Sequence, residues 1–306
     1  MSGKPTILLT GCHGLTGQYI IRSKPDYVYL HGTDIDDISL VHGISYEYHK
    51  FDITDRKDVK NIIEALRPEW IINTAAFTDV DECESSKECC WRINVEGLEN
   101  IIHYVKRTDA KLIHISTDYI FDGKKEIYEP DDLGSPLNYY GKAKLAAENL
   151  VKASGLEWTI LRTSTLYDVD NLKGRDNFVT WVIKSLQAGE KIKIVNDQWG
   201  NPTLARNLAE TVWKVIEKNA SGVYNAAGSE ICDRLSFTRE IAGVFDLDSS
   251  LIIPVSTGEL KQKAVRPLKI GLNVSTTEKD LELEFLSIKK GLTLFKMDYL
   301  SMHRVN

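Results

Sequence analysis

The chain has 306 residues, of which 42% are hydrophobic and 27% charged, so it can bury a substantial core in one large domain or two smaller ones. The formal net charge is −6 and Lys and Arg are scattered along the sequence, which argues against a nucleic-acid-binding protein or a membrane-surface protein. Small-molecule chemistry is the function class that remains.

Cysteines, histidines and the amino terminus exclude further classes. Five cysteines, without metal-finger or C-x-x-C spacing, favour a reduced compartment over a disulfide framework. The apolar run in "MSGKPTILLTG" is too short for a signal peptide or a membrane span, so we expect a cytoplasmic protein. The seven histidines form no i, i+4 pair, and we therefore predict no catalytic metal.

Short apolar runs alternate with helical periods through the first half of the chain. The runs lie at 6–11, 27–34, 45–52, 70–76, 111–117 and 158–164, with helical segments such as 56–69 and 88–107 between them. This alternation of strand, helix and strand is typical of βαβ units with right-handed crossovers. We predict an α/β fold of the Rossmann type, with a doubly wound parallel sheet covered by helices on both faces.

The alternation loosens after about residue 163. Helix candidates at 176–188, 203–218 and 235–245 are separated by strand-like segments at 191–197 and 222–228. We predict a nucleotide-binding domain over 1–162. The remainder, 163–306, is predicted to form mostly a smaller α/β substrate lobe, with some segments returning to the main sheet.

A glycine-rich turn joins the first strand to the first helix. Gly11, Gly14 and Gly17 follow a GxxGxxG spacing in "LLTGCHGLTGQYI". Such glycines allow a tight turn, close approach of a pyrophosphate and close packing of helix on strand, while the helix N-terminus attracts the anion. Alone, this motif also fits a glycine turn that binds nothing.

Asp34 makes the glycine turn more specific. It ends the second predicted strand, 20 residues after Gly14 (34 − 14 = 20), where an acid can accept hydrogen bonds from a ribose. Asp36 adds a second negative charge, and no Lys or Arg follows until Lys50, so a 2′-phosphate would be repelled. NADH is therefore predicted to be preferred, with NADPH possible.

Residues after the third and fourth strands are placed to contact the same cofactor. Asp52 and Ile53 follow the third strand, and "NTAAFT" at 73–78 follows the fourth. They would contact the adenine and line the cofactor with small side chains. The alternative is that these residues are helix caps and turn residues.

The segment "NYYGKAKLAAENL" at 138–150 holds a candidate proton donor. At 3.6 residues per turn Tyr140 and Lys144 share one face with Ala143 and Ala147, whereas Tyr139 and Lys142 point elsewhere. A nearby ammonium stabilises a phenolate, so we expect Lys144 to lower the pKa of Tyr140. A carbonyl reduced by hydride needs such a proton source. The alternative is an ordinary amphipathic helix whose lysine reaches water.

The strand over 111–117 should bring a hydroxyl to the same place. It ends in Ser116 and Thr117, and the carboxyl ends of the strands are where open α/β sheets bind ligands. Thr117 could polarise a substrate oxygen. The alternative is that both hydroxyls are only strand-end or capping groups.

Together these features resemble the extended short-chain dehydrogenase/reductases, and a longer series of motifs resembles the dTDP-4-dehydrorhamnose reductase family. The segments "HISTDYIFDG", "PLNYYGKAKLAAE", "LRTSTLY", "NFV", "IVNDQWGNPT" and "AVRPLKIGL" occur in that family's order from about residue 5 to 280. The resemblance implies reduction of the 4-keto group of a nucleotide-linked 6-deoxysugar by NADH or NADPH. It also implies a homodimer.

The resemblance assigns roles residue by residue. Tyr140 would be the proton donor, Lys144 its electrostatic partner and Thr117 the group on the substrate oxygen. The cofactor positions would be Gly11, Gly14, Leu15, Thr16, Gly17, Asp34, Ile35, Asp52, Ile53, Ala75, Ala76, Phe77, Thr78, Tyr140 and Lys144. The positions toward the nucleotide-sugar would be Thr117, Asp118, Thr165, Gln198, Asn201, Thr203 and Arg266.

Two departures and two alternatives bear on the substrate. Thr165 stands where well-known members carry a tryptophan, which removes stacking area against the sugar. Tyr119 stands where the related 4,6-dehydratases carry a glutamate, which disfavours dehydration. The alternatives are another nucleotide-sugar epimerase or reductase, and a non-catalytic regulatory subunit resembling that of methionine adenosyltransferase.

Overall fold

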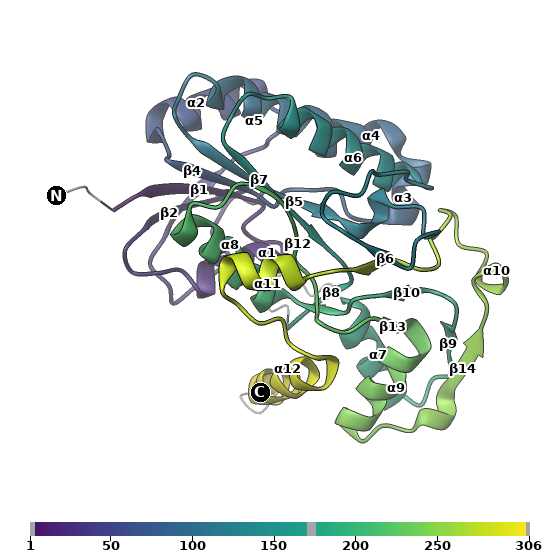
Figure 1. Cartoon of the computed structure of the whole chain (residues 1–306). Helices are drawn as coiled ribbons and strands as arrows, with labels where there is room; N and C mark the ends of the chain where they lie inside the picture. Colours follow the sequence, from purple (N-terminus) through teal and green to yellow (C-terminus); the bar gives the residue numbers. More distant parts are fainter. Residues whose placement is uncertain (1–3, 170–175, 304–306) are drawn as a thin grey trace.

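A computed structural model describes residues 4–169 and 176–303, and its framework is a sheet of seven parallel strands (Figure 1). The strand order is β12, β7, β5, β4, β1, β2, β3, which confirms the predicted doubly wound fold. The strands are β1 (Thr6–Thr10), β2 (Tyr29–Asp34), β3 (Glu47–Lys50), β4 (Trp70–Asn73), β5 (Lys111–Thr117), β7 (Trp158–Thr163) and β12 (Gly222–Asn225).

Helices cover both faces of this sheet (Figure 1). Alternate strand residues point to opposite faces, so Leu8 and Ile71 pack toward one helical layer while Leu9 and Ile72 pack toward the other. The first layer contains α2 (Arg56–Leu66), α5 (Gly97–Val105) and α6 (Tyr139–Lys152), with α3 (Val80–Ser85) and α4 (Lys87–Trp91) beside them. The second contains α1 (Leu15–Arg22), α8 (Ala205–Lys218) and α11 (Ser275–Leu281).

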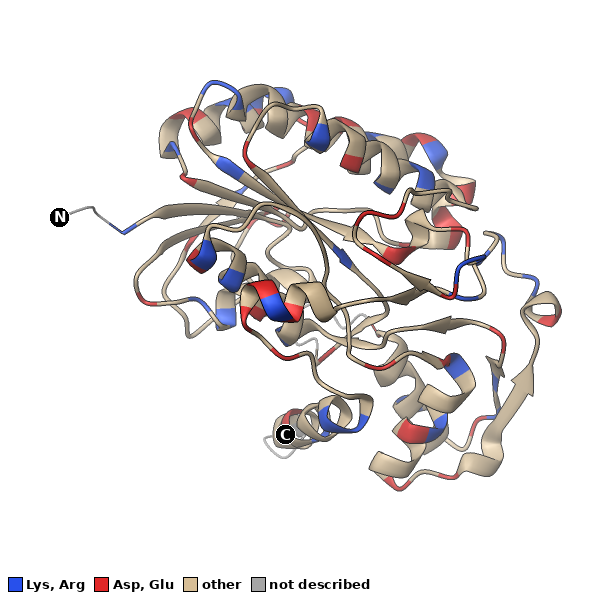
Figure 2. Cartoon of the chain, viewed as in Figure 1, with Lys and Arg blue, Asp and Glu red and all other residues tan. Residues whose placement is uncertain are grey.

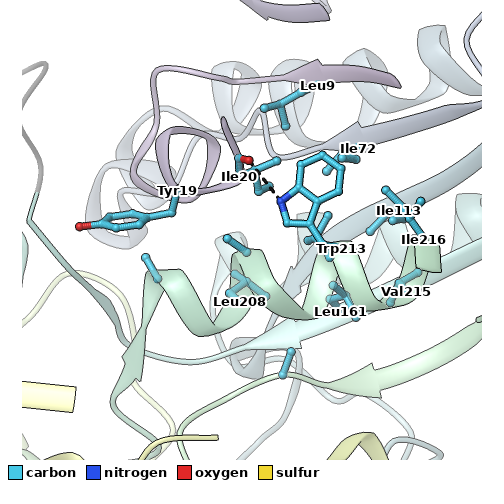
Figure 3. Packing of buried hydrophobic residues seen from close by; sticks show 14 of the residues in the cluster. Leu9, Tyr19, Ile20, Ile72, Ile113, Leu161, Leu208, Trp213, Val215 and Ile216 are labelled. Atoms are coloured by element: carbon cyan, nitrogen blue, oxygen red, sulfur yellow. Dashed lines mark hydrogen bonds between the residues drawn. The ribbon is translucent and has the colours of Figure 1, made fainter. Parts of the chain in front are cut away.

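Helix α8 fixes the second half of the chain beneath the sheet (Figure 3). Trp213 lies between Ile20 of α1 and the apolar underside of the strands, and its indole N–H donates to the Ile20 carbonyl at 3.2 Å. Burying an aromatic ring and satisfying its one donor makes this contact specific. Strand β12 pairs with β7 and therefore belongs to the main sheet. Helix α8 packs on that sheet, so both elements are part of the sheet region although they follow residue 163.

The remaining segments form a smaller lobe on one side of the sheet (Figure 1). Its apolar centre includes Tyr167, Phe237 and Phe295. The predicted helices at 176–188, 203–218 and 235–245 are confirmed as α7, α8 and α9 within two residues. The lobe and its connections contain β6 (Ile127–Tyr128), β8 (Leu166–Tyr167), α7 (Phe178–Gln187), β9 (Ile192–Val195), β10 (Trp199–Gly200), β11 (Thr203–Leu204), β13 (Cys232–Asp233), α9 (Arg234–Phe245), β14 (Ile252–Val255), α10 (Thr257–Leu260), β15 (Gly271–Leu272) and α12 (Ile288–His303).

Charged residues of both signs are interspersed over the helices of both layers and the lobe (Figure 2). In this view the described Lys and Arg residues do not gather on one side, in keeping with the composition. Among the described residues no helix is both long and apolar enough to cross a bilayer.

Candidate active site

A cavity of about 920 Å³ opens at the carboxyl ends of the parallel strands, between the sheet and the lobe. Its lining begins in the β1–α1 turn and continues through residues that follow β2, β3, β4 and β5. The order of strands reverses between β1 and β4, and that switch point is where open α/β sheets bind ligands. The lobe closes the other side with residues such as Gln198 and Arg234.

The glycine turn has the geometry of a phosphate cradle. Gly11 has φ +68°, and a Cβ there would lie 2.7 Å from the backbone nitrogen of Ala75. A Cβ on Gly17 would lie 2.4 Å from the Gly11 carbonyl oxygen, so only glycine lets α1 approach the turn. Gly14 caps α1 without a side-chain hydrogen bond, which leaves backbone N–H groups of the helix start for an anion in the cavity.

Two carboxylates lie beside this turn. Asp34, at the end of β2 as predicted, accepts from the backbone N–H of His13 at 2.9 Å. Asp36 Oδ2 lies 2.7 Å from His13 Nδ1. Lys50, the next cation along the sequence, is 2.5 Å from Asp37 and does not line the cavity. This corner of the cavity is therefore acidic.

The predicted cofactor positions all line the cavity, including Asp52, Ile53 and the segment Ala75 to Thr78. Asp52 also accepts from the Thr54 N–H at 2.8 Å, so it stabilises the turn as well. The cap of α2 is Asp55, which accepts from the N–H groups of Lys57 and Asp58. The N-cap of α2 is therefore Asp55 and not Asp52.

Helix α6 presents the predicted face to the interior. Tyr140, Ala143, Lys144 and Ala147 are buried, whereas Lys142 is exposed and Tyr139 is half-buried. Asn138 begins the helix by accepting from the Gly141 N–H at 2.8 Å. This cap fixes the start of the helix, and with it the position of the phenol in the cavity wall.

Tyr140 and Thr117 come together in that wall. Burial raises the pKa of Tyr140, and a side-chain hydrogen bond with Thr117 opposes part of the rise. Thr117 also donates to Asp118 Oδ1 at 3.0 Å. Because its pKa is raised, the phenol carries its proton at neutral pH.

The charge of Lys144 does not lower the pKa of Tyr140 in the way that the sequence suggested. Its ammonium donates to the Ile115 carbonyl at 2.6 Å and lies 3.1 Å from His114 Nε2. Burial lowers the pKa of Lys144 to about 8, and burial with the charge of Lys144 also holds the pKa of His114 well below its usual value. The expected lowering of the Tyr140 pKa is wrong for this structure because desolvation of the phenol dominates.

A buried ion pair holds α6 onto the sheet directly behind this site. Arg162 of β7 donates from Nε and a terminal nitrogen to the two oxygens of Glu148, at 3.0 and 2.9 Å. The same guanidinium donates to the Pro130 carbonyl at 2.9 Å. Burial alone would raise the pKa of Glu148, but the hydrogen bonds and charge of Arg162 hold it below its ordinary value.

Four of the predicted sugar-side residues line the cavity: Thr117, Asp118, Thr165 and Gln198. Burial raises the pKa of Asp118, against hydrogen bonds from Ser164 and Thr117. Thr165 has φ +40°, which is strained for a β-branched residue. Gln198 is held in place because it donates to Thr257 and Gln262, each at 3.0 Å.

Three predicted sugar-side residues do not line the cavity. Asn201 is buried and donates to the Gly228 carbonyl at 2.7 Å, while Thr203 accepts from the Gly228 N–H at 3.0 Å. Arg266 is paired with Asp81 at 3.0 Å and lies over the ring of Tyr119. Their side chains hold loops together, and the structure gives them no place at the cavity surface.

Sequence reasoning missed several lining residues, including Arg92, Trp199 and Arg234. Arg234 begins α9 and lies over the Phe178 ring, 4.8 Å from its centroid. Trp199 is 41% exposed beside Gln198. Trp199 could have been noticed within "NDQWGNPT", but no sequence signal marks Arg234 because its position depends on how the lobe folds over the sheet.

The chain matches a known family over most of its length. The family model described as RmlD substrate binding domain covers residues 5–300. The chain belongs to the dTDP-4-dehydrorhamnose reductase family. Membership of this family makes it a nicotinamide-dependent oxidoreductase that reduces the 4-keto group of a nucleotide-linked sugar.

Members of this reductase family are similar in both sequence and structure. A probable low-salt glycan biosynthesis reductase from Haloferax volcanii is 31% identical over 89% of this chain and 91% of its own. A dTDP-4-dehydrorhamnose reductase from Clostridium acetobutylicum superposes with a TM-score of 0.85 at 31% identity, covering 97% and 99% of the two chains. One from Bacillus anthracis, solved with NADP, has a TM-score of 0.84 at 28% identity, covering 96% and 99%.

Proposed function

We propose that this reductase acts on a nucleotide-linked 4-keto-6-deoxysugar, with Tyr140, Thr117 and Lys144 as its catalytic residues. One observation carries the proposal: the phenol, the hydroxyl, the ammonium and the glycine turn all line the same cavity. A cavity of about 920 Å³ lies within the range of small-molecule and cofactor sites. The family relation supplies the reaction class.

The fit to a dinucleotide is supported by three features of the residues themselves. Side chains would block the turn at Gly11 and Gly17, α1 begins without a side-chain cap, and Asp34 stands at the end of β2 in the cavity lining. The turn and the helix start suit a pyrophosphate, and the carboxylate suits a ribose. Bound NAD(P)H would supply the hydride that adds to the carbonyl carbon.

The protein residues then handle the proton. Tyr140 gives its hydroxyl proton to the carbonyl oxygen, so the reduced sugar leaves as an alcohol. Thr117 turns its single hydroxyl proton from Asp118 to the same oxygen and polarises it. Lys144, held by the Ile115 carbonyl, keeps a positive charge near the phenolate that remains, until solvent returns the proton.

We further propose a preference for NADH over NADPH. Asp34 lines the cavity where the ribose hydroxyls would be bound, whereas Asp36 contacts His13 outside the described lining and Lys50 is paired with Asp37. A 2′-phosphate would meet the Asp34 carboxylate, and Lys50 is already paired elsewhere. The NADP-bound relative from Bacillus anthracis makes this a preference to be measured in this chain.

The sugar specificity should differ from that of members with tryptophan at position 165. Thr165 leaves room in the lining where an indole would stack, and Trp199 is the exposed aromatic side chain on the lobe side of the cavity. We propose that Trp199 provides the aromatic surface for the sugar nucleotide. A homodimer and a cytoplasmic location remain predictions, of which the first is checked by light scattering on a sizing column.

The deciding experiment incubates the purified protein with NADH and a panel of nucleotide-linked 4-keto-6-deoxysugars. We expect loss of the 340 nm absorbance of NADH together with an alcohol product at C4, identified by mass spectrometry and NMR. The same panel with NADPH measures the cofactor preference.

Other outcomes would assign the alternatives. A product with altered stereochemistry and no net NADH consumption would identify an epimerase. Tight NADH binding without turnover of any keto sugar, together with capture of a partner enzyme, would identify a regulatory subunit. Either result would overturn the proposed reduction.

A further inference from the structure

Two histidines and a glutamate meet on the outer part of the sheet, away from the cavity. His31 lies on β2, and Glu47 and His49 lie on β3, the edge strand. His31 Nδ1 is 3.0 Å from His49 Nε2 and 3.4 Å from Glu47 Oε2. One ligand atom from each residue lies within 4.8 Å of the other two.

The register of the parallel strands brings these three residues together. His31 is aligned with Glu47, and Thr33, two residues further, is aligned with His49. Since strand side chains alternate with period two, Glu47 and His49 share a face. His31 is aligned with Leu8, which packs toward α2 and α5. The histidines are 18 residues apart in sequence, so a search for i, i+4 pairs misses them.

We propose that His31, Glu47 and His49 form a binding site for one borderline divalent transition-metal ion, with Zn²⁺ as the best match. Imidazole nitrogen and carboxylate oxygen are ligands that Zn²⁺ takes at about 2.0–2.2 Å in a tetrahedral arrangement. That geometry requires neighbouring ligand atoms to be about 3.3 Å apart, and the two separations from His31 Nδ1, 3.0 and 3.4 Å, bracket this value.

The site has an open side and one adjustable ligand. His31 is 9% exposed, whereas the Glu47 side chain is 74% exposed and can rotate onto the ion. Three protein ligands leave a fourth position for water. Without metal, the two imidazoles would share a single N–H···N hydrogen bond, which is the competing explanation for their close approach.

A second group with metal-ligand side chains is a poorer candidate. Cys12, His13 and Asp34 also approach one another within 4.8 Å. Both ring nitrogens of His13 are already engaged, because Nδ1 lies 2.7 Å from Asp36 and Nε2 accepts from the Leu40 N–H at 3.1 Å. The geometry therefore favours the group on β2 and β3.

A metal ion bound to these three residues would cross-link the edge strand β3 to its neighbour β2. None of these three residues belongs to the described lining of the cavity, and His31 precedes Asp34 by three residues, about 10 Å along the strand. The ion would thus stabilise β3 and the fold without taking part in the reduction. This separates the proposal from the proposed function, since either can fail alone.

The test uses the full chain with any polyhistidine tag removed and all metal stripped by chelator. Calorimetric titration with Zn²⁺ should give one ion per chain. Zn²⁺ at on the order of 100 times Kd should raise Tm by about 5 °C. Co²⁺ in place of Zn²⁺ should give the visible absorption of a tetrahedral site.

Substitutions of the proposed ligands test where the ion binds. His31→Gln and His49→Gln should each weaken Zn²⁺ binding by more than about tenfold, since even outer-shell partners of metal ligands are worth about 10- to 100-fold. His42→Gln, at an exposed histidine of the same region, is the matched control and should bind Zn²⁺ as the parent does. NADH binding reports that each variant is folded, and His49→Gln serves if the more buried His31 variant does not fold.

Two results would overturn the site. The first is no heat of binding and no rise in Tm with Zn²⁺ in the parent chain, which leaves the imidazole–imidazole hydrogen bond as the explanation. The second is binding of equal affinity in the parent and in both histidine variants, which would put the ion elsewhere, for example at Cys12, His13 and Asp34.

Discussion

The sheet half of the cavity and the lobe half hold their functional groups in different ways. On the sheet side, Asp34 and Thr117 stand at the ends of strands of six and seven residues, each paired along its length. On the lobe side, Thr165 and Gln198 lie next to strands of only two residues, β8 and β10. Their positions depend on individual hydrogen bonds, such as those of Gln198 to Thr257 and Gln262.

The two halves of the cavity position their functional groups through different kinds of interaction. Regular pairing fixes strand ends with many equivalent backbone bonds, so the sheet side tolerates change in a single side chain. The two-residue strands beside Thr165 and Gln198 offer little such redundancy, so the individual polar contacts of these residues matter more. The ion pairs show the same contrast, because Glu148–Arg162 is buried under α6 whereas Arg206–Asp298, between α8 and α12, is half-exposed.

The largest effect should come from the buried pair. Glu148→Gln leaves Arg162 charged and buried, so we expect a loss of about 3–5 kcal/mol in the free energy of unfolding. Asp298→Asn is the control, and its exposed pair should be worth less than about 1 kcal/mol. Urea denaturation followed by circular dichroism measures both, and equal losses would show that burial does not distinguish the two ion pairs.

The same pair predicts a pH dependence of stability. The pKa of Glu148 is held below its ordinary value in the folded state, so the unfolded chain binds the proton more readily. The stabilisation is fully present above the unfolded pKa of about 4.3 and is lost as pH falls through the folded pKa. In Glu148→Gln this part of the acid destabilisation should be missing from a series of unfolding curves below pH 5.

The next largest effect concerns turnover. Tyr140→Phe removes the proposed proton donor but keeps the ring, so kcat should fall by about 10² or more while NADH affinity stays within a fewfold. Tyr139→Phe, one residue earlier and half-buried, should leave kcat unchanged. Steady-state kinetics and NADH fluorescence titration separate the two quantities, and an unchanged kcat in Tyr140→Phe would require a different acid.

Much of the sheet side could be predicted from the sequence. The period of the apolar runs located the strands, the rule for strand ends placed Asp34 and Thr117, and the helical period placed Tyr140 on a buried face. The positions of the lobe residues could not be predicted in this way. Asn201 and Thr203 occur in a recognisable motif, yet the fold commits them to Gly228, and Arg234 enters the lining through a helix start that carries no periodic signal.

The electrostatics of the site could be predicted less well from the sequence than the position of its residues. The spacing of Tyr140 and Lys144 was correct, but the sign of the pKa shift was wrong, because desolvation depends on how much of the surrounding protein excludes water. The meeting of His31 with His49 was also invisible, since strand register brings together residues far apart in sequence.

A smaller effect is expected on the choice of cofactor. Asp34→Asn removes a charge from the acidic corner, so the ratio of kcat/KM for NADH to that for NADPH should fall by about tenfold. Asp37→Asn, whose exposed side chain pairs with Lys50, should change the ratio little. Parallel initial-rate measurements decide, and a preference that survives in Asp34→Asn would show that other groups set it.

The smallest effect tests the strain on the lobe side. Thr165 has φ +40°, so Thr165→Gly should relieve strain that exceeds the added chain entropy, for a net gain of about 1 kcal/mol. Lys261, at φ +48° but without a β-branch, is the comparison, and Lys261→Gly should gain less. Thermal unfolding measures both, and a destabilised Thr165→Gly would show that the hydroxyl or methyl group outweighs the backbone strain.

The return of β12 and α8 to the main sheet limits how this enzyme can be re-engineered. Cutting after residue 162 would uncover the β7 edge and the apolar underside on which Trp213 rests. A chimera that borrows another relative's sugar specificity should therefore keep 205–225 and α11 from this chain and exchange only segments of the lobe.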